Sequence, residues 1–284
     1  MSGHVAIITD STAYLPPAAL RRHGIEAVPL TVVLGDQALE EGTEISARSL
    51  ETALRERRPV TTSRPSPAMF ARAYRAAARA GATGIVSLHL SAEISGTYDA
   101  ALLAAKESPV PVRVVDTGVV AMALGFCALA AAEAVEEAGG VGSLDDAVAA
   151  AEKRAEGISA LFYVDTLDYL RRGGRIGAAQ ALLGSALAVK PLLELADGTI
   201  GMLEKVRTAS RAIARLEEIV VERAGEASVD IAVHHLAASD RAELLAGRLR
   251  ERVPGLRELH VSEVGAVIGA HTGPGLLGAV VSVR

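Results

Sequence analysis

The sequence predicts a two-domain α/β protein. In its first half, short runs of β-branched residues alternate with alanine-rich stretches, which is typical of βαβ units and a parallel sheet. From about residue 158 the pattern changes, and Asp197-Gly198 between two extended runs indicates a hairpin. We therefore expect an N-terminal α/β domain at residues 1–157, a C-terminal α+β domain at residues 158–284, and a ligand-binding crevice between them.

Three parallel strands and five helices are expected in the first domain. Ser66 can cap the second helix and Pro67 can begin it. Residues 27–41 form two extended pieces around Gly35-Asp36, which indicates a small hairpin insertion, and the glycine-rich residues 138–143 interrupt the chain. The strands are expected at residues 5–8, 84–88 and 112–115, and the helices at residues 16–23, 67–80, 97–106, 119–137 and 144–156.

The second domain is expected to follow a different order of elements. After Ile158 we expect a strand, two short helices, a hairpin, a long helix, a strand, a helix and two further strands. A type I′ hairpin turn needs positive φ at both central residues, which Asp197 and Gly198 tolerate. The second sheet is therefore expected to be mixed or antiparallel.

Composition argues against several classes of protein. With 34 acidic and 29 basic residues and 3% aromatic residues, the chain lacks the positive charge and the stacking surfaces that nucleic-acid binding uses. The single cysteine, Cys127, cannot form a disulfide within the chain, and no leader-like segment precedes the first strand, so we expect a cytoplasmic protein. The longest apolar run, at residues 119–132, is shorter than the roughly 20 residues that span a bilayer, so we expect a buried helix there.

The sequence indicates neither a cofactor nor a metal. Residues 273–278 match G-x-G-x-x-G, but the helix and the acidic residue that a dinucleotide site needs do not follow. His234 and His235 are adjacent in an expected strand, so their side chains point to opposite faces and cannot share a metal there. We therefore expect no bound cofactor and no metal ligands.

Two polar loops lie in the first third of the chain. Residues 9–12 follow the first strand, and helix capping explains them as well as ligand binding does. In residues 61–66, Ser66 is sufficient to begin the next helix, so Thr62 and Ser63 have no capping role. These two side chains are candidates for ligand binding.

Two further polar loops complete the set. Residues 91–98 follow a buried strand and open a helix, so that free amides, the Ser95 hydroxyl and Gly96 form an arrangement suited to anions. His271 precedes the rigid turn Gly273-Pro274-Gly275, and the other histidines have no comparable turn beside them.

A basic segment lies between Asp165 and Arg215. It contains more basic than acidic residues in a chain that is acidic as a whole. A solvated helix face is one interpretation, and a docking surface for an acidic partner, a phosphate or an anionic lipid headgroup is the other. The basic residues are Arg171, Arg172, Arg175, Lys190, Lys205, Arg207, Arg211 and Arg215.

Taken together, the four loops and four further short motifs resemble the DegV family of bacterial fatty-acid-binding proteins. The resemblance extends over nearly the whole chain, and the order of the motifs makes it specific. The matching residues are Ile8-Thr9-Asp10-Ser11-Thr12, Thr62-Ser63-x-Pro65-Ser66, Leu90-Ser91 with Ile94-Ser95-Gly96-Thr97-Tyr98, Val115-Asp116-Thr117, Arg172-Gly173-Gly174-Arg175-Ile176, Lys190-Pro191, Asp197-Gly198 and His271-x-Gly273-Pro274-Gly275.

The resemblance implies a two-domain protein that binds one long-chain fatty acid, such as palmitate, stearate or oleate, in a buried apolar pocket between the domains. It implies no catalytic residue of its own, because an ATP-dependent fatty-acid kinase subunit phosphorylates the bound carboxylate for phospholipid synthesis. Transient contact with a membrane surface would accompany this role. By motif, Thr62, Ser95 and His271 would bind the carboxylate, Ser63 and Gly96 would be neighbours, and Arg175 and Arg207 would contact a partner or phosphate outside the pocket.

Two rival functions remain open from the sequence. A hydrolase or phosphotransferase could use Ser95 as nucleophile and His271 as base, although no acidic residue is placed by the sequence to orient His271. A sensor or scaffold could use the basic segment alone, which would require a partner but no pocket.

Overall fold

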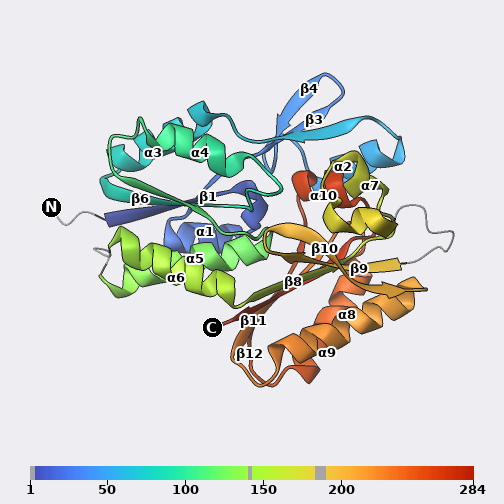
Figure 1. Cartoon of the computed structure of the whole chain (residues 1–284). Coiled ribbons are helices and arrows are strands. Elements are labelled where there is room, and N and C mark those ends of the chain that lie inside the picture. Colours follow the sequence, from blue (N-terminus) through green and yellow to red (C-terminus); the bar gives the residue numbers. More distant parts are fainter. Residues whose placement is uncertain (1–3, 140–142, 183–189) are drawn as a thin grey trace. The chain divides into compact units, whose positions relative to one another are not determined.

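The computed structural model describes residues 4–139, 143–182 and 190–284, with the backbone alone for residues 181 and 182 (Figure 1). The chain forms two compact units. Unit 1 consists of Met1–Thr31 and Ser63–Glu156, and unit 2 of Val32–Thr62 and Gly157–Arg284. Residues 32–62 thus belong to unit 2, whereas the sequence analysis assigned them to the N-terminal domain.

Unit 1 contains a fully parallel sheet, as predicted. Its strand order is β2-β1-β6-β7, and each neighbouring pair is parallel. In Figure 1, α3 and α4 lie on one side of this sheet and α1, α5 and α6 on the other. The strands are β1 (His4–Asp10), β2 (Glu26–Val28), β6 (Ala82–His89) and β7 (Val112–Asp116), and the helices are η1 (Ser11–Ala13), α1 (Pro17–His23), α3 (Pro67–Arg79), α4 (Thr97–Ala105), α5 (Met122–Glu137) and α6 (Leu144–Glu156).

The apolar residues of these elements form the core of unit 1. Ile8, Phe70, Tyr74 and Ile85 are buried in one cluster. Helix α5 is buried along most of its length, as predicted. Gly125 allows the close approach of the Ala13 carbonyl oxygen, because a Cβ at this position would overlap that atom.

Ser66 is the N-cap residue of α3 and Pro67 follows it as predicted, but the Ser66 side chain makes no capping hydrogen bond. Of the predicted glycine-rich break at residues 138–143, residues 140–142 lie outside the described residues.

The larger sheet of unit 2 is mixed, as predicted. Its order is β10-β9-β8-β13-β11-β12, in which β11 and β12 are parallel and the other neighbours are antiparallel. Asp197 and Gly198 have φ angles of 49° and 74°, which confirms the expected positive-φ turn. The strands are β8 (Ile158–Tyr163), β9 (Lys190–Ala196), β10 (Thr199–Val206), β11 (Val229–His235), β12 (Leu256–Glu263) and β13 (Leu277–Val283).

Helices α8 (Ala209–Ala224) and α9 (Ser239–Arg252) supply apolar side chains to the core of unit 2. Leu216, Val220, Leu245 and Leu249 belong to one buried cluster with Val233 of the sheet. The shorter helices α7 (Asp168–Arg172) and η2 (Gly177–Leu182) precede β9, where two short helices were predicted.

The structure corrects the prediction of two consecutive strands at the end of the second domain. Helix α10 (Ala266–Thr272) lies between β12 and β13. Val267, Ile268 and Gly269 lower its intrinsic helix propensity, so the local sequence does not indicate a helix. Packing against α2 (Ala47–Arg55) stabilises it instead.

Residues 32–62 join unit 2 through this packing. They contain the predicted hairpin, β3 (Thr31–Leu34) and β4 (Gln37–Glu40), which forms a three-stranded sheet of order β4-β3-β5 with β5 (Val60–Ser63). The predicted insertion is therefore larger than a hairpin, because it also includes α2 and a third strand.

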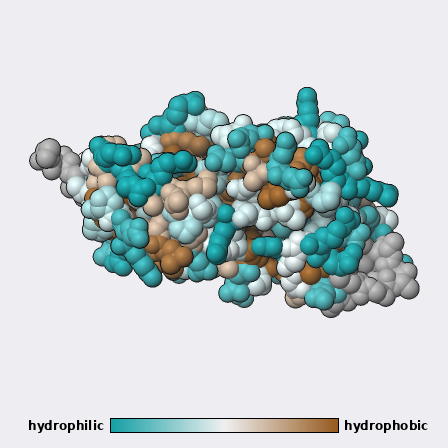
Figure 2. All heavy atoms as spheres, turned by 90° about the horizontal axis from the view of Figure 1, so that it is seen from above, coloured by the Kyte–Doolittle hydropathy of each residue, from teal (hydrophilic) through white to brown (hydrophobic). Residues whose placement is uncertain are grey.

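The face drawn in Figure 2 is largely hydrophilic, with hydrophobic side chains scattered over it. The exposed large apolar residues of the chain include Leu103 and Leu244. None of the helices in the described ranges is both long enough and apolar enough to cross a membrane.

Candidate functional site

Thr62 and His271 are joined by a hydrogen bond within unit 2. Thr62 lies on β5 and His271 lies in the last turn of α10. The Thr62 Oγ1 and His271 Nε2 atoms are 2.7 Å apart. The structure thus brings together two side chains that the sequence analysis assigned to carboxylate binding.

The imidazole of His271 is held in its neutral form. Burial, and secondarily the positive charge of Arg175, lower the pKa of His271 to about 4. Its Nδ1 atom is buried and has no hydrogen-bond partner among the described residues. At pH 7 a neutral imidazole therefore faces Thr62.

The absence of a side chain at Gly173 provides the space that the His271 imidazole occupies. A Cβ at Gly173 would overlap the imidazole ring. The Gly173 carbonyl oxygen accepts a hydrogen bond of 2.7 Å from Arg175 Nη1. The Gly-Gly-Arg motif therefore contributes both a gap and a nearby cation to the surroundings of His271, while the sequence analysis had considered Arg175 only as a contact outside the pocket.

Ser95 and Gly96 lie at the start of α4 in unit 1. The Ser95 Oγ atom is 2.8 Å from Thr97 Oγ1 and accepts a hydrogen bond of 3.3 Å from the Thr97 amide. Gly96 is the N-cap residue of α4, as expected for a helix-opening loop. The Ser95 hydroxyl is thus held at the helix N-terminus, where the backbone favours anions.

Arg64 is a residue of this loop region that the sequence analysis missed. Its Nη1 atom donates a hydrogen bond of 3.3 Å to the Gly96 carbonyl oxygen, and a Cβ at Gly96 would overlap the guanidinium. Ser63, the preceding residue, is exposed and donates from Oγ to the Arg64 carbonyl oxygen. The sequence gives no signal for Arg64, because the Thr62-Ser63-x-Pro65-Ser66 motif leaves its position open.

The basic segment is partly neutralised by its own acidic neighbours. Arg215 forms ion pairs with Glu204, Glu218 and Glu222. Lys190 donates from Nζ to the Asp165 carbonyl oxygen. Arg207, by contrast, is exposed at the end of β10. The segment as a whole is therefore not a uniform cationic face.

A buried chain of hydrogen bonds occurs in unit 1 that the sequence analysis did not anticipate. Tyr74 Oη donates to Ser87 Oγ at 2.9 Å, and Ser87 Oγ is 2.7 Å from His89 Nε2. His89 Nδ1 is 3.1 Å from Asp10 Oδ2, which also accepts from the Leu90 amide at 3.1 Å. Asp10 therefore fixes the end of β6, from which the Ser95 loop begins.

Ser87, His89 and Asp10 are hydrogen-bonded in the order of a hydrolytic triad. The side chains of Ser87, His89 and Asp10 nevertheless belong to residues with 0% exposure, so an ester cannot reach the hydroxyl. This series of hydrogen bonds is accordingly a structural link and not a hydrolase site.

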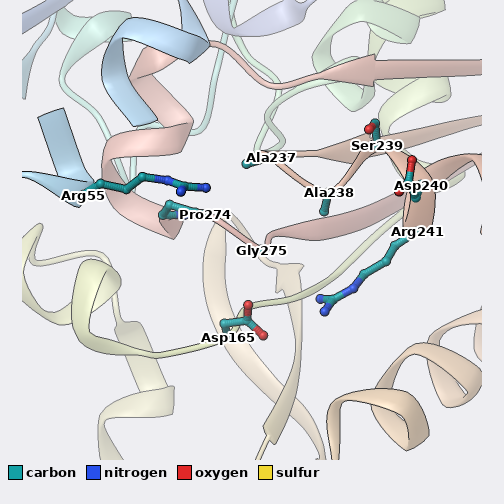
Figure 3. Close-up of a pocket in the computed structure, with 9 residues that line it drawn as sticks. All are labelled: Arg55, Asp165, Ala237, Ala238, Ser239, Asp240, Arg241, Pro274 and Gly275. Atoms are coloured by element: carbon teal, nitrogen blue, oxygen red, sulfur yellow. The ribbon is translucent and has the colours of Figure 1, made fainter. Parts of the chain in front are cut away.

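A cavity of about 380 Å³ lies in unit 2 beside the turn that follows His271. Figure 3 shows that Arg55, Arg241 and Asp165 surround it, while Pro274 and Gly275 form part of its wall. A Cβ at Gly275 would overlap the Asp165 carboxylate. Two guanidinium groups and the carboxylates of Asp165 and Asp240 give the cavity balanced charge.

In the described ranges, no cluster of three or more His, Cys, Asp or Glu side chains could hold a metal ion.

Comparison with known proteins decides the family. The family model described as "Uncharacterised protein, DegV family" matches residues 4–284. The chain belongs to the DegV family. A DegV domain-containing protein of Streptomyces coelicolor is 77% identical over 284 residues and is covered, like this chain, over 100% of its length.

Solved DegV structures share the fold over almost the whole chain. A structure described as showing fatty acid binding of a DegV family protein from Thermus thermophilus has a TM-score of 0.92 and 35% identity, and covers 99% of this chain and 100% of that one. A structure described as DegV, a fatty acid binding protein from Bacillus subtilis, has a TM-score of 0.91 and 33% identity, with 100% of both chains covered.

Proposed function

We propose that this DegV protein binds one long-chain fatty acid in an apolar pocket and holds the carboxylate with Thr62, Ser95 and His271. Ser63 and the backbone of Gly96 are neighbouring contacts. The hydrogen bond between Thr62 Oγ1 and His271 Nε2 is the observation that carries the proposal. The two DegV proteins described as fatty-acid-binding support the class of ligand.

The chemistry of the pair suits a carboxylate. With its proton on Nε2, His271 donates to Thr62 Oγ1, and the threonine hydroxyl hydrogen is then available to a carboxylate oxygen. The Ser95 hydroxyl is a second donor. A neutral imidazole provides a donor without a permanent cation that would retain a charged acyl phosphate.

The acyl chain supplies affinity and the carboxylate contacts supply position. Burial of an acyl chain is worth about 0.8 kcal/mol per methylene, so a chain of about 15 methylenes contributes on the order of 12 kcal/mol before association costs. Palmitate, stearate and oleate are ligands of suitable length. No cofactor is needed for this role.

The proposal extends to a partner. This chain presents the carboxylate, and a separate ATP-dependent fatty-acid kinase subunit converts it to an acyl phosphate for phospholipid synthesis. Arg175 and Arg207 are candidates for contacts with that partner or with phosphate. The protein acts in the cytoplasm, with transient membrane contact when the lipid enters or leaves.

The test is mass spectrometry of lipid extracted from the purified protein. We expect about one fatty acid per chain. His271→Ala should weaken binding about tenfold or more, because Thr62 loses the donor that directs its hydroxyl hydrogen toward the carboxylate, while the tail still binds. His260→Ala, a change of another histidine in unit 2, should leave the affinity unaltered.

Absence of lipid together with failure to bind added fatty acid would contradict the proposal. Hydrolysis of esters by the chain alone, lost in both Ser95→Ala and His271→Ala, would support the hydrolase instead.

A further inference from the structure

Helix α10, which carries His271, is contacted at three points by residues 32–62. Thr62 bonds to the imidazole at its C-terminal end. Leu50 of α2 lies against its middle, where a Cβ at Gly269 would overlap the leucine side chain. Glu41 contacts its first turn: the Glu41 Oε1 atom accepts a hydrogen bond of 2.8 Å from the Val267 amide.

The Glu41 contact is unusual because it involves a buried carboxylate. Glu41 is 5% exposed, directly after β4, and removing a carboxylate from water requires donors in return. Val267 is the second residue of α10, so its amide has no acceptor within the helix. Glu41 therefore satisfies a backbone amide that the helix itself leaves without an acceptor.

Helix α10 needs this support. It has seven residues, and its β-branched residues and Gly269 are poor helix formers. Isolated helices of this length are unstable in water. The orientation of His271 at the far end therefore depends on how firmly the first turn is fixed.

We propose that Glu41 is a positioning residue for His271, acting as the hydrogen-bond acceptor that fixes the start of α10. Through this contact it keeps the imidazole within bonding distance of Thr62. The significance for ligand binding rests on the proposed function, but the positioning itself does not.

The test compares Glu41→Ala, Glu41→Gln and the control Glu44→Ala. Glutamine retains an acceptor oxygen, whereas alanine removes it. Glu44 is exposed in the same turn, and its carboxylate accepts from the Glu40 amide at 2.8 Å. Circular dichroism first establishes that each variant is folded.

The primary measurement is NMR of the His271 imidazole nitrogens with hydrogen exchange of the α10 amides. In Glu41→Ala we expect faster exchange in α10 but not in α9, and an altered Nε2 signal as the bond to Thr62 loosens. Glu41→Gln should remain close to the wild type, and Glu44→Ala should match it. Wild-type signals and exchange in Glu41→Ala, or equal damage in a folded Glu41→Gln, would overturn the proposal.

The second measurement is affinity for palmitate. Glu41→Ala should weaken it about tenfold, similar to loss of one hydrogen bond to a charged group. If the wild type bound no palmitate, the proposed function would fail while the NMR arm would still decide the role of Glu41. Altered NMR signals with unchanged palmitate affinity would contradict only the assignment of His271 to the carboxylate.

Discussion

At the scale of single residues, the absence of a side chain at Gly173 leaves room for the His271 imidazole. Its φ angle is −76°, so any residue could adopt its backbone conformation. The restriction is steric, because His271 occupies the space where a Cβ would lie. Its neighbour Gly174 is restricted for the opposite reason: it has a φ of 70° and open space around it.

These two glycines give a matched pair of predictions. Gly173→Ala should displace the His271 imidazole and weaken fatty-acid binding about tenfold or more, the effect of losing a hydrogen bond to a charged group. Gly174→Ala should instead lower the free energy of unfolding by about 1 kcal/mol through backbone strain, with affinity preserved. Binding titrations and urea denaturation separate the two effects, and equal affinities for both variants would refute the steric explanation.

At the scale of elements, two helical glycines differ in the same way. Gly247 of α9 has no atom within 4 Å of a Cβ placed on it, whereas a Cβ on Gly269 of α10 would overlap Leu50 and approach Leu236. Neither has positive φ. The first glycine is therefore a local weakness of its helix, and the second is a requirement of packing.

Alanine at these positions should have opposite effects on stability. Gly247→Ala should raise the free energy of unfolding by about 0.5 to 1 kcal/mol, because alanine loses less backbone entropy in a helix. Gly269→Ala should lower it by about 1 to 3 kcal/mol through overpacking. Urea denaturation followed by circular dichroism measures both, and stabilisation by Gly269→Ala would show that α2 and α10 are not tightly packed.

The elements that could be predicted from sequence are those with local signals. Helix α6 has acidic residues in its first turn and an alanine-rich body, and the Asp197-Gly198 turn has its own backbone preference. Helix α10 has no such signal, because its stability comes from α2, more than two hundred residues earlier. The motifs indicated Thr62 and His271, whereas Glu41 and the steric role of Gly173 depend on contacts that no local pattern reveals.

At the scale of the whole molecule, two buried histidines of unit 2 predict sensitivity to acid. Burial lowers the pKa values of His234 and His271 to about 4, from about 6.5 in an unfolded chain. Between these values the unfolded chain binds more protons than the folded one. Their contribution to stability is therefore complete above pH 6.5 and is lost as the pH falls toward 4.

Denaturation by urea at pH 7, 5.5 and 4.5 should show this loss. His234→Asn retains a polar group toward Ser262, the hydrogen-bond partner of His234, and removes one titration. We expect the stability of this variant to depend less on pH than that of the wild type over the same range. Parallel curves would assign the acid sensitivity to other groups.

Docking of the proposed kinase is a second property of the whole molecule. Because Arg215 is occupied by three glutamates while Arg207 is exposed, Arg207→Glu should reduce partner-dependent acyl phosphate formation several-fold through lost electrostatic attraction, and fatty-acid binding should stay intact. Arg250→Glu makes the same charge change at an exposed position of α9 and serves as the control. Equal coupling in both variants would remove Arg207 from the docking surface.

The contacts of residues 32–62 also bear on how the chain folds as it is synthesised. Glu41 and Val267 are separated by 226 residues, and Thr62 and His271 by 209. Domains usually begin to fold from the N-terminus during translation, but this early segment emerges long before α10 exists. Until then the apolar face of α2 has no partner, and the nascent chain presents it to solvent or to chaperones. In ribosome-bound intermediates we therefore expect the strands of unit 1 to be folded, while β3, β4 and α2 remain unpacked until the C-terminal third of the chain has been synthesised.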